Sequence, residues 1–294
     1  MRKIDAVIVG AQKAGTTSLN TYLAEHPDIL GHPQTEFAYF RDDNEYQQDY
    51  DQVFDRYFTL GDSTSSIVLA KNAAIYDSEK AIKRLADHNP DCKIIFLLRN
   101  PVSRAISSYH MERFNGWMKH ELDEIVGVIE REEYESVLYR LLINMGLYAD
   151  HLQVLQEHFP KKNIKLYLFE ELKQDTASVY RDICHWLGVS DSFLPDLEAK
   201  HNPTYEARNE MLSNLIFRLR SEKNPVKRFV KTILPYSTFT KLGNLLVDSN
   251  RSGKKPKPAS TELKEYLHDY FRPFNDRLRE MTDLDIDIWN KPAG

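Results

Sequence analysis

The sequence predicts an α/β protein of three layers, in which helices cover both faces of a central parallel sheet. Three short apolar runs, at about residues 4–10, 93–98 and 164–169, are expected to be strands. Each run is apolar throughout rather than alternating, which is typical of strands buried on both faces. Helical patterns separate the runs, and strands that alternate with helices favour parallel pairing.

The expected helices share the apolar spacing of amphipathic helices. They cover residues 16–26, 78–88, 101–114, 121–144, 147–158 and 175–187. The last pattern stops at Gly188, and glycine commonly follows a helix C-terminus. In folds of this kind ligands bind beyond the carboxyl ends of the strands, so functional residues are expected at that edge.

The composition is that of an ordinary globular chain. Of 294 residues, 41% are hydrophobic and 11% aromatic, and the mean hydropathy is -0.54. These values exclude fibrous, disordered and membrane-embedded classes. We expect one domain over residues 1–294, with an irregular subregion at 190–260 where prolines interrupt the helical patterns. A net charge of -5 disfavours nucleic acid as a partner.

The cysteines suggest neither a metal nor a redox site. Cys92 and Cys184 lie far apart and neither belongs to a CxxC unit, so both are expected to be small core residues. The chain has no apolar run of eighteen residues and no signal peptide, which predicts a cytoplasmic location and no transmembrane segment.

The first strand runs into a glycine-bounded loop, VIVGAQKAGTTSL, that predicts an anion site. Backbone amides at a helix start lack partners within the helix and carry partial positive charge, so a phosphate or sulfate can bind there. The spacing of Gly10 and Gly15 matches half of a nucleotide-binding P-loop. However, Thr16 and Thr17 stand where that motif requires Lys and then Ser or Thr, and the lysine is instead Lys13. The pattern favours a phosphate-like ligand other than ATP.

A second strand-to-helix turn, in KIIFLLRNPVSRAISSY at 93–109, carries Arg99 and Ser107. An arginine offers a planar fork of donors that suits phosphate oxygens, and a serine hydroxyl adds one directional contact. Taken singly, Arg99 could be a solvated charge at a strand end and Ser107 a helix serine bonded to its own backbone. Two such turns in one chain are an unlikely coincidence, so the pair is more specific than either turn alone.

Together these motifs resemble the sulfotransferases that use 3′-phosphoadenosine 5′-phosphosulfate (PAPS), and the chain is most similar to the heparan sulfate branch, as a bacterial member. The similarity covers nearly the whole chain and implies a P-loop-like α/β fold. It implies that the 5′-phosphosulfate is held by Lys13, Ala14, Gly15, Thr16, Thr17 and Ser18. It also implies that Arg99 and Ser107 bind the 3′-phosphate.

The basic segment NRSGKKPKP at 250–258, followed by a helix from about Thr261 to Met281, resembles the loop that closes over the nucleotide in that branch. The resemblance implies donor contacts from Ser252, Gly253, Lys254 and Lys255. A solvated linker is the alternative reading of this composition.

The resemblance also implies the catalytic groups. PQTEFAYF at 33–40 is similar to the segment that carries the family's glutamate, so Glu36 would be the general base, and Lys13 would stabilise charge on the leaving group. Thr35, Ala38 and Tyr39 depart from the family pattern. Competing bases are His26, His32, His110 and His201. No metal is expected.

Lys71 and Tyr148 are the remaining candidates, because both fall where relatives carry residues near the donor or acceptor. Asn72 and Ala73 depart from the pattern around Lys71, and a tyrosine at this spacing can equally be a core residue. The expected acceptor is a hydroxyl, of a carbohydrate or glycolipid or, alternatively, of a lipid, polyketide or other small metabolite. Two other function classes are a P-loop phosphotransferase and a noncatalytic polyanion-binding protein.

Overall fold

The computed structural model describes residues 2–33, 36–58, 66–197, 249–250, 252 and 256–290. The chain divides into two compact units. The first unit comprises residues 1–104, 144–202 and 269–294, and the second comprises 105–143 and 203–268. Two helices, α5 (Pro101–Phe114) and α13 (Thr261–Met281), run from one unit into the other. The expectation of a single domain stays a prediction.

The first unit is built on a parallel five-stranded sheet in the order β2-β3-β1-β4-β5. The strands are β1 (Ala6–Gly10), β2 (Ile29–Leu30), β3 (Ile67–Lys71), β4 (Lys93–Leu98) and β5 (Ile164–Leu168). The three expected strands are confirmed, whereas β2 and β3 were missed. β1 is central and all five of its residues are buried, as its uninterrupted apolar sequence predicts.

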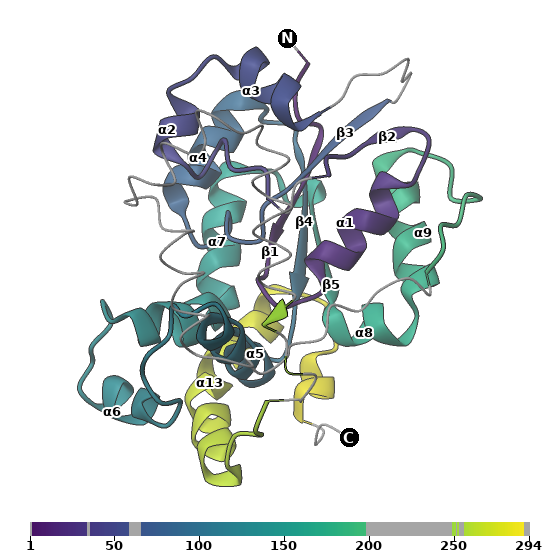
Figure 1. Cartoon of the computed structure of the whole chain (residues 1–294). Helices are drawn as coiled ribbons and strands as arrows, with labels where there is room; N and C mark the ends of the chain where they lie inside the picture. Colours follow the sequence, from purple (N-terminus) through teal and green to yellow (C-terminus); the bar gives the residue numbers. More distant parts are fainter. Residues whose placement is uncertain are drawn as a thin grey trace. The chain divides into compact units, whose positions relative to one another are not determined.

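Helices cover both faces of this sheet (Figure 1). On one face lie α1 (Thr16–Ala24), α8 (Phe169–Gln174) and α9 (Thr176–Leu187). On the other lie α2 (Asp43–Tyr46), α3 (Tyr50–Tyr57), α4 (Glu79–His88) and α7 (Tyr148–His158). The predicted three-layer α/β fold is therefore confirmed.

Local sequence signals explain where several helices begin and end. Ser78 and Asp175 are N-caps whose side chains accept amide hydrogen bonds from Ala81 and Ser178, at 3.3 and 2.9 Å. Gly188 follows α9 in the left-handed conformation, with φ of 85°, as the sequence predicts. The two cysteines are fully buried, which confirms the expectation that they are core residues.

The second unit corrects one expected helix. Residues 121–144 form the short helix α6 (Glu124–Glu130), an irregular turn, and a π-helical turn at Tyr139–Ile143, instead of one long helix. The cause lies in the charged run that follows Glu130, which offers no apolar face to pack, and in Glu132, which has a left-handed φ of 54°. The expected helix from Thr261 to Met281 is confirmed as α13, which also contains Pro273.

Candidate active site

The loop after β1 has the backbone geometry of an anion site. Gly15 is the N-cap of α1 and takes a left-handed φ of 82°, and as a glycine it has no side chain to cap the helix start. Lys13 is also left-handed, at φ 74°. A Cβ on Gly15 would lie 3.0 Å from the Phe169 ring, so glycine is required here for packing as well as for conformation. The first-turn amides of α1 are thus presented at the carboxyl edge of the sheet.

Arg99 joins the two predicted anion motifs. Its Nη1 donates to the Lys13 carbonyl oxygen at 2.8 Å, and its guanidinium lies over the Phe169 ring, 4.8 Å from the centroid. Burial lowers the pKa of Arg99, although a guanidinium with this starting value stays charged at neutral pH. The strand order explains the contact, because β1 and β4 are neighbours and end at the same edge.

Tyr148 supports Arg99 from the core. Its hydroxyl donates to the Arg99 carbonyl oxygen at 2.8 Å, and the side chain is almost fully buried. Burial raises the pKa of Tyr148 to about 12, so the hydroxyl keeps its proton and acts as a donor. The contact ties α7 to the end of β4. A contact between Tyr148 and substrate stays a prediction.

Glu36 is held at the edge of the sheet by Lys71. Lys71 Nζ lies 2.7 Å from one Glu36 carboxylate oxygen, and the amide of Ala73 donates to the other oxygen at 2.8 Å. Lys71 Nζ also donates to Thr17 Oγ1 at 3.2 Å. The Lys71 side chain is 1% exposed and that of Glu36 is 39% exposed. A buried lysine therefore connects the start of α1 to a carboxylate that is partly exposed to solvent.

The segment after Glu36 is fixed by the end of β3. The amide of Phe37 donates to the Lys71 carbonyl oxygen at 2.7 Å, and Asn72 Nδ2 donates to the Phe37 carbonyl oxygen at 3.0 Å. Asn72 departs from the family pattern, yet its buried side chain helps to orient Glu36. Sequence reasoning missed this role, since β3 itself was not expected.

The competing histidines occupy different settings. Both ring nitrogens of His26 are engaged, Nε2 with the Ser190 carbonyl oxygen at 2.8 Å and Nδ1 as the acceptor of the Asp28 amide at 3.0 Å. His32 is buried, and its Nε2 accepts the Lys71 amide at 3.1 Å. Both therefore have structural partners. His110 lies on α5 in the second unit, and His201 lies outside the described residues.

The remaining predicted donor contacts belong to the second unit or are not described. Ser107 lies in the second turn of α5 and is half-buried, as is Ser252. Both serines are part of the second unit. Gly253, Lys254 and Lys255 lie outside the described residues. The first unit thus brings together Lys13, Thr17, Glu36, Lys71 and Arg99, and the other assignments stay predictions.

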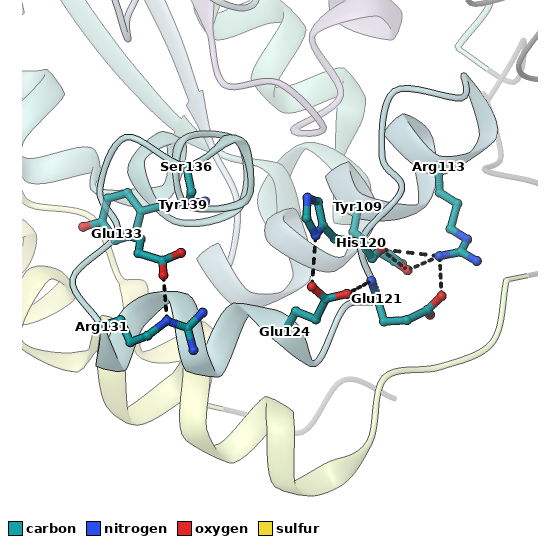
Figure 2. A network of polar contacts seen from close by, with 9 residues as sticks. All are labelled: Tyr109, Arg113, His120, Glu121, Glu124, Arg131, Glu133, Ser136 and Tyr139. Carbon is teal, nitrogen blue, oxygen red and sulfur yellow. Dashed lines mark hydrogen bonds and ion pairs between the residues drawn. The ribbon is translucent and has the colours of Figure 1, made fainter.

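The second unit carries a polar network of its own (Figure 2). His120 Nδ1 lies 3.0 Å from Glu124, and Arg131 Nε donates to Glu133 at 2.6 Å. The Glu121 amide and the His120 ring lower the pKa of the Glu124 carboxyl. These side chains border a cavity of about 430 Å³ whose lining also includes the buried Val128 and Leu138. All four paired side chains are well exposed to solvent.

Comparison with known proteins decides the family. The family model of the sulfotransferase domain matches residues 3–228, which is more than half of the 294 residues. The chain belongs to the sulfotransferase family. The resemblance found in the sequence motifs is thereby confirmed, and this sulfotransferase is an enzyme of the PAPS-dependent class.

Relatives agree with this assignment, and a solved structure has the same fold. The sulfotransferase is 26% identical over 283 residues to human bifunctional heparan sulfate N-deacetylase/N-sulfotransferase 3, covering 94% of this chain and 29% of that protein. The mouse N-deacetylase/N-sulfotransferase 4 is 26% identical over 284 residues, with the same shares covered. This chain therefore spans less than a third of the length of these relatives. The crystal structure of a sulfotransferase from Alicyclobacillus acidocaldarius has the same fold, with a TM-score of 0.68 and 24% identity, and the match covers 99% of this chain and 100% of that one.

Two features are absent from the parts of the chain that the structure describes. None of the helices in these parts of the chain is both long and apolar enough to cross a membrane. No group of three or more His, Cys, Asp or Glu side chains is arranged to hold a metal ion in the same ranges.

Proposed function

We propose that this enzyme transfers the sulfuryl group of PAPS to a hydroxyl of a carbohydrate or glycolipid, with Glu36 as the general base. The observation that carries the proposal is the chain of contacts from Thr17 through Lys71 to Glu36. It supports the proposal because Lys71 contacts both Glu36 and Thr17, and Thr17 lies in the helix start where the phosphosulfate is expected. The bound donor supplies an activated sulfuryl group, and the protein supplies its binding and the proton acceptor.

The residues of the first unit suit the donor. Amides at the start of α1 and the Thr16 and Thr17 side chains would hold the 5′-phosphate. Lys13 would lie against the bridging oxygen and offset the negative charge that grows on the departing phosphate. Arg99 would bind the 3′-phosphate through the edge of its guanidinium that Lys13 does not use.

The reaction needs one proton acceptor. The acceptor oxygen attacks sulfur as the bond from sulfur to the phosphate oxygen breaks, and adenosine 3′,5′-bisphosphate leaves. The hydroxyl proton passes to the Glu36 carboxylate. Lys71 orients that carboxylate through a charge-assisted hydrogen bond of 2.7 Å. The exposed part of Glu36 is the part that an acceptor can approach.

The names of the relatives favour a saccharide acceptor, since both act on heparan sulfate. Those names also specify N-sulfation, so an amine nitrogen is the second candidate for the atom that receives the sulfuryl group. A lipid, polyketide or other metabolite hydroxyl is the competing acceptor class. A structure with an acceptor analogue beside Glu36 would separate a saccharide from an apolar molecule.

The proposal is tested by separating donor binding from transfer. With radiolabelled PAPS and an oligosaccharide panel carrying free hydroxyls or free amines, Glu36→Gln is expected to lower kcat by about 10² to 10⁴. Its affinity for adenosine 3′,5′-bisphosphate should stay close to that of the parent enzyme. Glu157→Gln, an exposed carboxylate on α7, is the matched control and should behave as the parent.

Two results would contradict the proposal in different ways. Unchanged sulfuryl transfer by Glu36→Gln would overturn the base assignment alone. Magnesium-dependent turnover of ATP, without transfer from PAPS, would instead favour a phosphotransferase and reject the donor itself.

A further inference from the structure

The 3₁₀ turn η4 (Ile286–Asn290) packs against the turn that follows β4. Asn100 Nδ2 donates to the Trp289 carbonyl oxygen at 2.9 Å, and the Trp289 side chain is 4% exposed. Asn100 comes directly after Arg99, and its own side-chain oxygen accepts the Ser103 amide at 2.9 Å, which fixes the start of α5. The turn that carries Arg99 is therefore held by Trp289, which lies 189 residues after Asn100 in the sequence.

Glu170 closes this contact from a third segment. One of its carboxylate oxygens accepts the Asn100 amide at 3.2 Å, and the other accepts the Trp289 indole N–H at 3.1 Å. The Glu170 carboxylate thus joins the first turn of α8 to the turn after β4 and to η4. Hydrogen bonds to a charged acceptor are stronger and more directional than neutral ones, so this arrangement is well suited to fixing geometry.

Trp289 also touches the other group that orients Arg99. The Trp289 and Tyr148 rings have centroids 6.0 Å apart, and the Tyr148 hydroxyl donates to the Arg99 carbonyl oxygen. Phe169, over which the Arg99 guanidinium lies, is the neighbour of Glu170 in α8. The backbone and the guanidinium of Arg99 are therefore both set by groups that Trp289 and Glu170 hold in place.

We propose that Trp289 and Glu170 are positioning residues for the 3′-phosphate of the donor. They act through Arg99 and contact neither the donor nor the acceptor. The inference rests on the proposed donor, because it needs Arg99 to bind that phosphate. A guanidinium held in its binding orientation before the nucleotide arrives loses less conformational freedom on binding. Loosening the turn should therefore weaken recognition of the 3′-phosphate selectively.

The experiment compares two nucleotides on two tryptophan variants. Trp289→Phe keeps the aromatic packing and removes the N–H that Glu170 accepts. Trp186→Phe is the matched control, because Trp186 also donates through its indole N–H, to the Lys162 carbonyl oxygen at 3.4 Å, and lies away from Arg99. Affinities for adenosine 3′,5′-bisphosphate and for AMP, which lacks the 3′-phosphate, are measured by calorimetry.

Trp289→Phe is expected to weaken binding of adenosine 3′,5′-bisphosphate by about tenfold, which is the scale of one charge-assisted hydrogen bond. Binding of AMP and kcat at saturating PAPS should stay near the parent values, and Trp186→Phe should change neither nucleotide. An equal loss of affinity for both nucleotides would show that Trp289 is a general packing residue. No loss of affinity would show that Trp289 does not position Arg99. Either result overturns the inference.

A second pair of variants tests the same contact from its other side, in case Trp289→Phe does not fold. Glu170→Gln cannot accept both N–H groups as a carboxylate does, whereas Glu171→Gln alters only the neighbouring carboxylate that caps the Leu168 amide. Glu170→Gln should repeat the selective loss, and Glu171→Gln should not. Failure of the donor proposal has a different signature, because the parent enzyme would then bind adenosine 3′,5′-bisphosphate no better than AMP.

Discussion

The polar contacts of the two units differ in burial. In the first unit, the Lys71 side chain is 1% exposed and bonds to Glu36 and Thr17. In the second unit, the Arg131 side chain is 64% exposed and bonds to Glu133. The two ion pairs are almost equally short, at 2.7 and 2.6 Å. Distance alone therefore does not distinguish a contact that organises a site from one that lies on a surface.

Solvent explains the difference. An exposed ion pair competes with water and salt, and its net contribution is usually about 0–1 kcal/mol. A buried cation has lost its hydration and depends on its protein partners, so removing one side of the pair has large effects. Removing the contacts around Glu36 and Arg99 should consequently lower activity, while removing those in Figure 2 should affect only the local structure.

The largest contrast is expected between Lys71→Met and Arg131→Met. Without Lys71, the Glu36 carboxylate loses its charged partner and the link to Thr17, so kcat should fall by about 10²-fold. Arg131→Met removes an exposed pair and should leave kcat within experimental error. Single-turnover transfer from PAPS measures both variants. Comparable losses in the two would show that burial is not what separates these contacts.

A smaller contrast is expected between Arg99→Lys and Arg113→Lys. A lysine at 99 keeps the charge but loses the planar fork and the stacking on Phe169, so affinity for adenosine 3′,5′-bisphosphate should fall by about tenfold. Arg113 pairs with the exposed Glu121 in the second unit, and its replacement should leave that affinity unchanged. Calorimetry gives both values, and an intact affinity in Arg99→Lys would contradict the role of the fork.

A half-buried histidine, His88, gives the stability of the first unit a dependence on pH. Burial lowers the pKa of His88 to about 4, and its Nε2 accepts the Ile4 amide at 3.1 Å, which only the neutral ring can do. The unfolded chain gains this proton near pH 6.5 and the folded chain only near 4. The contribution of neutral His88 to the free energy of unfolding is therefore fully present above pH 6.5 and is lost as the pH falls toward 4. The loss is roughly 1–2 kcal/mol once solvent screening is allowed for.

Urea unfolding at pH 7 and pH 5 measures this effect. His88→Gln should flatten the dependence of the free energy of unfolding on pH across this window. Ser136→Ala, in the second unit, changes no titratable side chain and should leave the slope of the parent protein. A parent-like slope in His88→Gln would show that another group is responsible.

The last contrast is between two glycines, whose replacements should change stability in opposite directions. Gly15→Ala places a Cβ 3.0 Å from the Phe169 ring at φ 82° and should cost about 1–2 kcal/mol. Gly127 lies inside α6, and the three atoms nearest to a Cβ there all belong to the Arg131 guanidinium, the closest at 2.8 Å, which can move into solvent. Gly127→Ala should therefore stabilise the protein by about 0.5–1 kcal/mol. Thermal unfolding of both variants decides the signs.

The sequence predicted the elements whose own residues determine them. β4 and α5 were expected at the bounds observed, because an apolar run followed by Asn and Pro specifies a buried strand and a helix start locally. β3 was missed, since its IVLAK sequence is short and ends in a lysine that looks like a surface residue. Only the fold reveals that Lys71 is buried against Glu36.

The candidate site was predictable where motifs are continuous and unpredictable where contacts are remote. Lys13 and Arg99 were both expected, and the neighbouring positions of β1 and β4 bring them together. Glu170 and Trp289 carry no local signal, because the partners of each lie in other segments of the chain. Interactions of this kind depend on tertiary packing and are not encoded in the spacing of nearby residues.

The strand order of the first unit also bears on how the enzyme folds. β1 pairs with β3 and β4, which lie some sixty and ninety residues further along the chain, as the register of Ala6 with Leu69 and Lys93 shows. Closing such long loops is slow, because the chain loses conformational entropy before the contacts between the paired strands can compensate for that loss. Lys13, Lys71 and Arg99 come together only once both pairings exist. Nucleotide binding should therefore be among the last properties to return during refolding, after the helical circular dichroism signal has recovered.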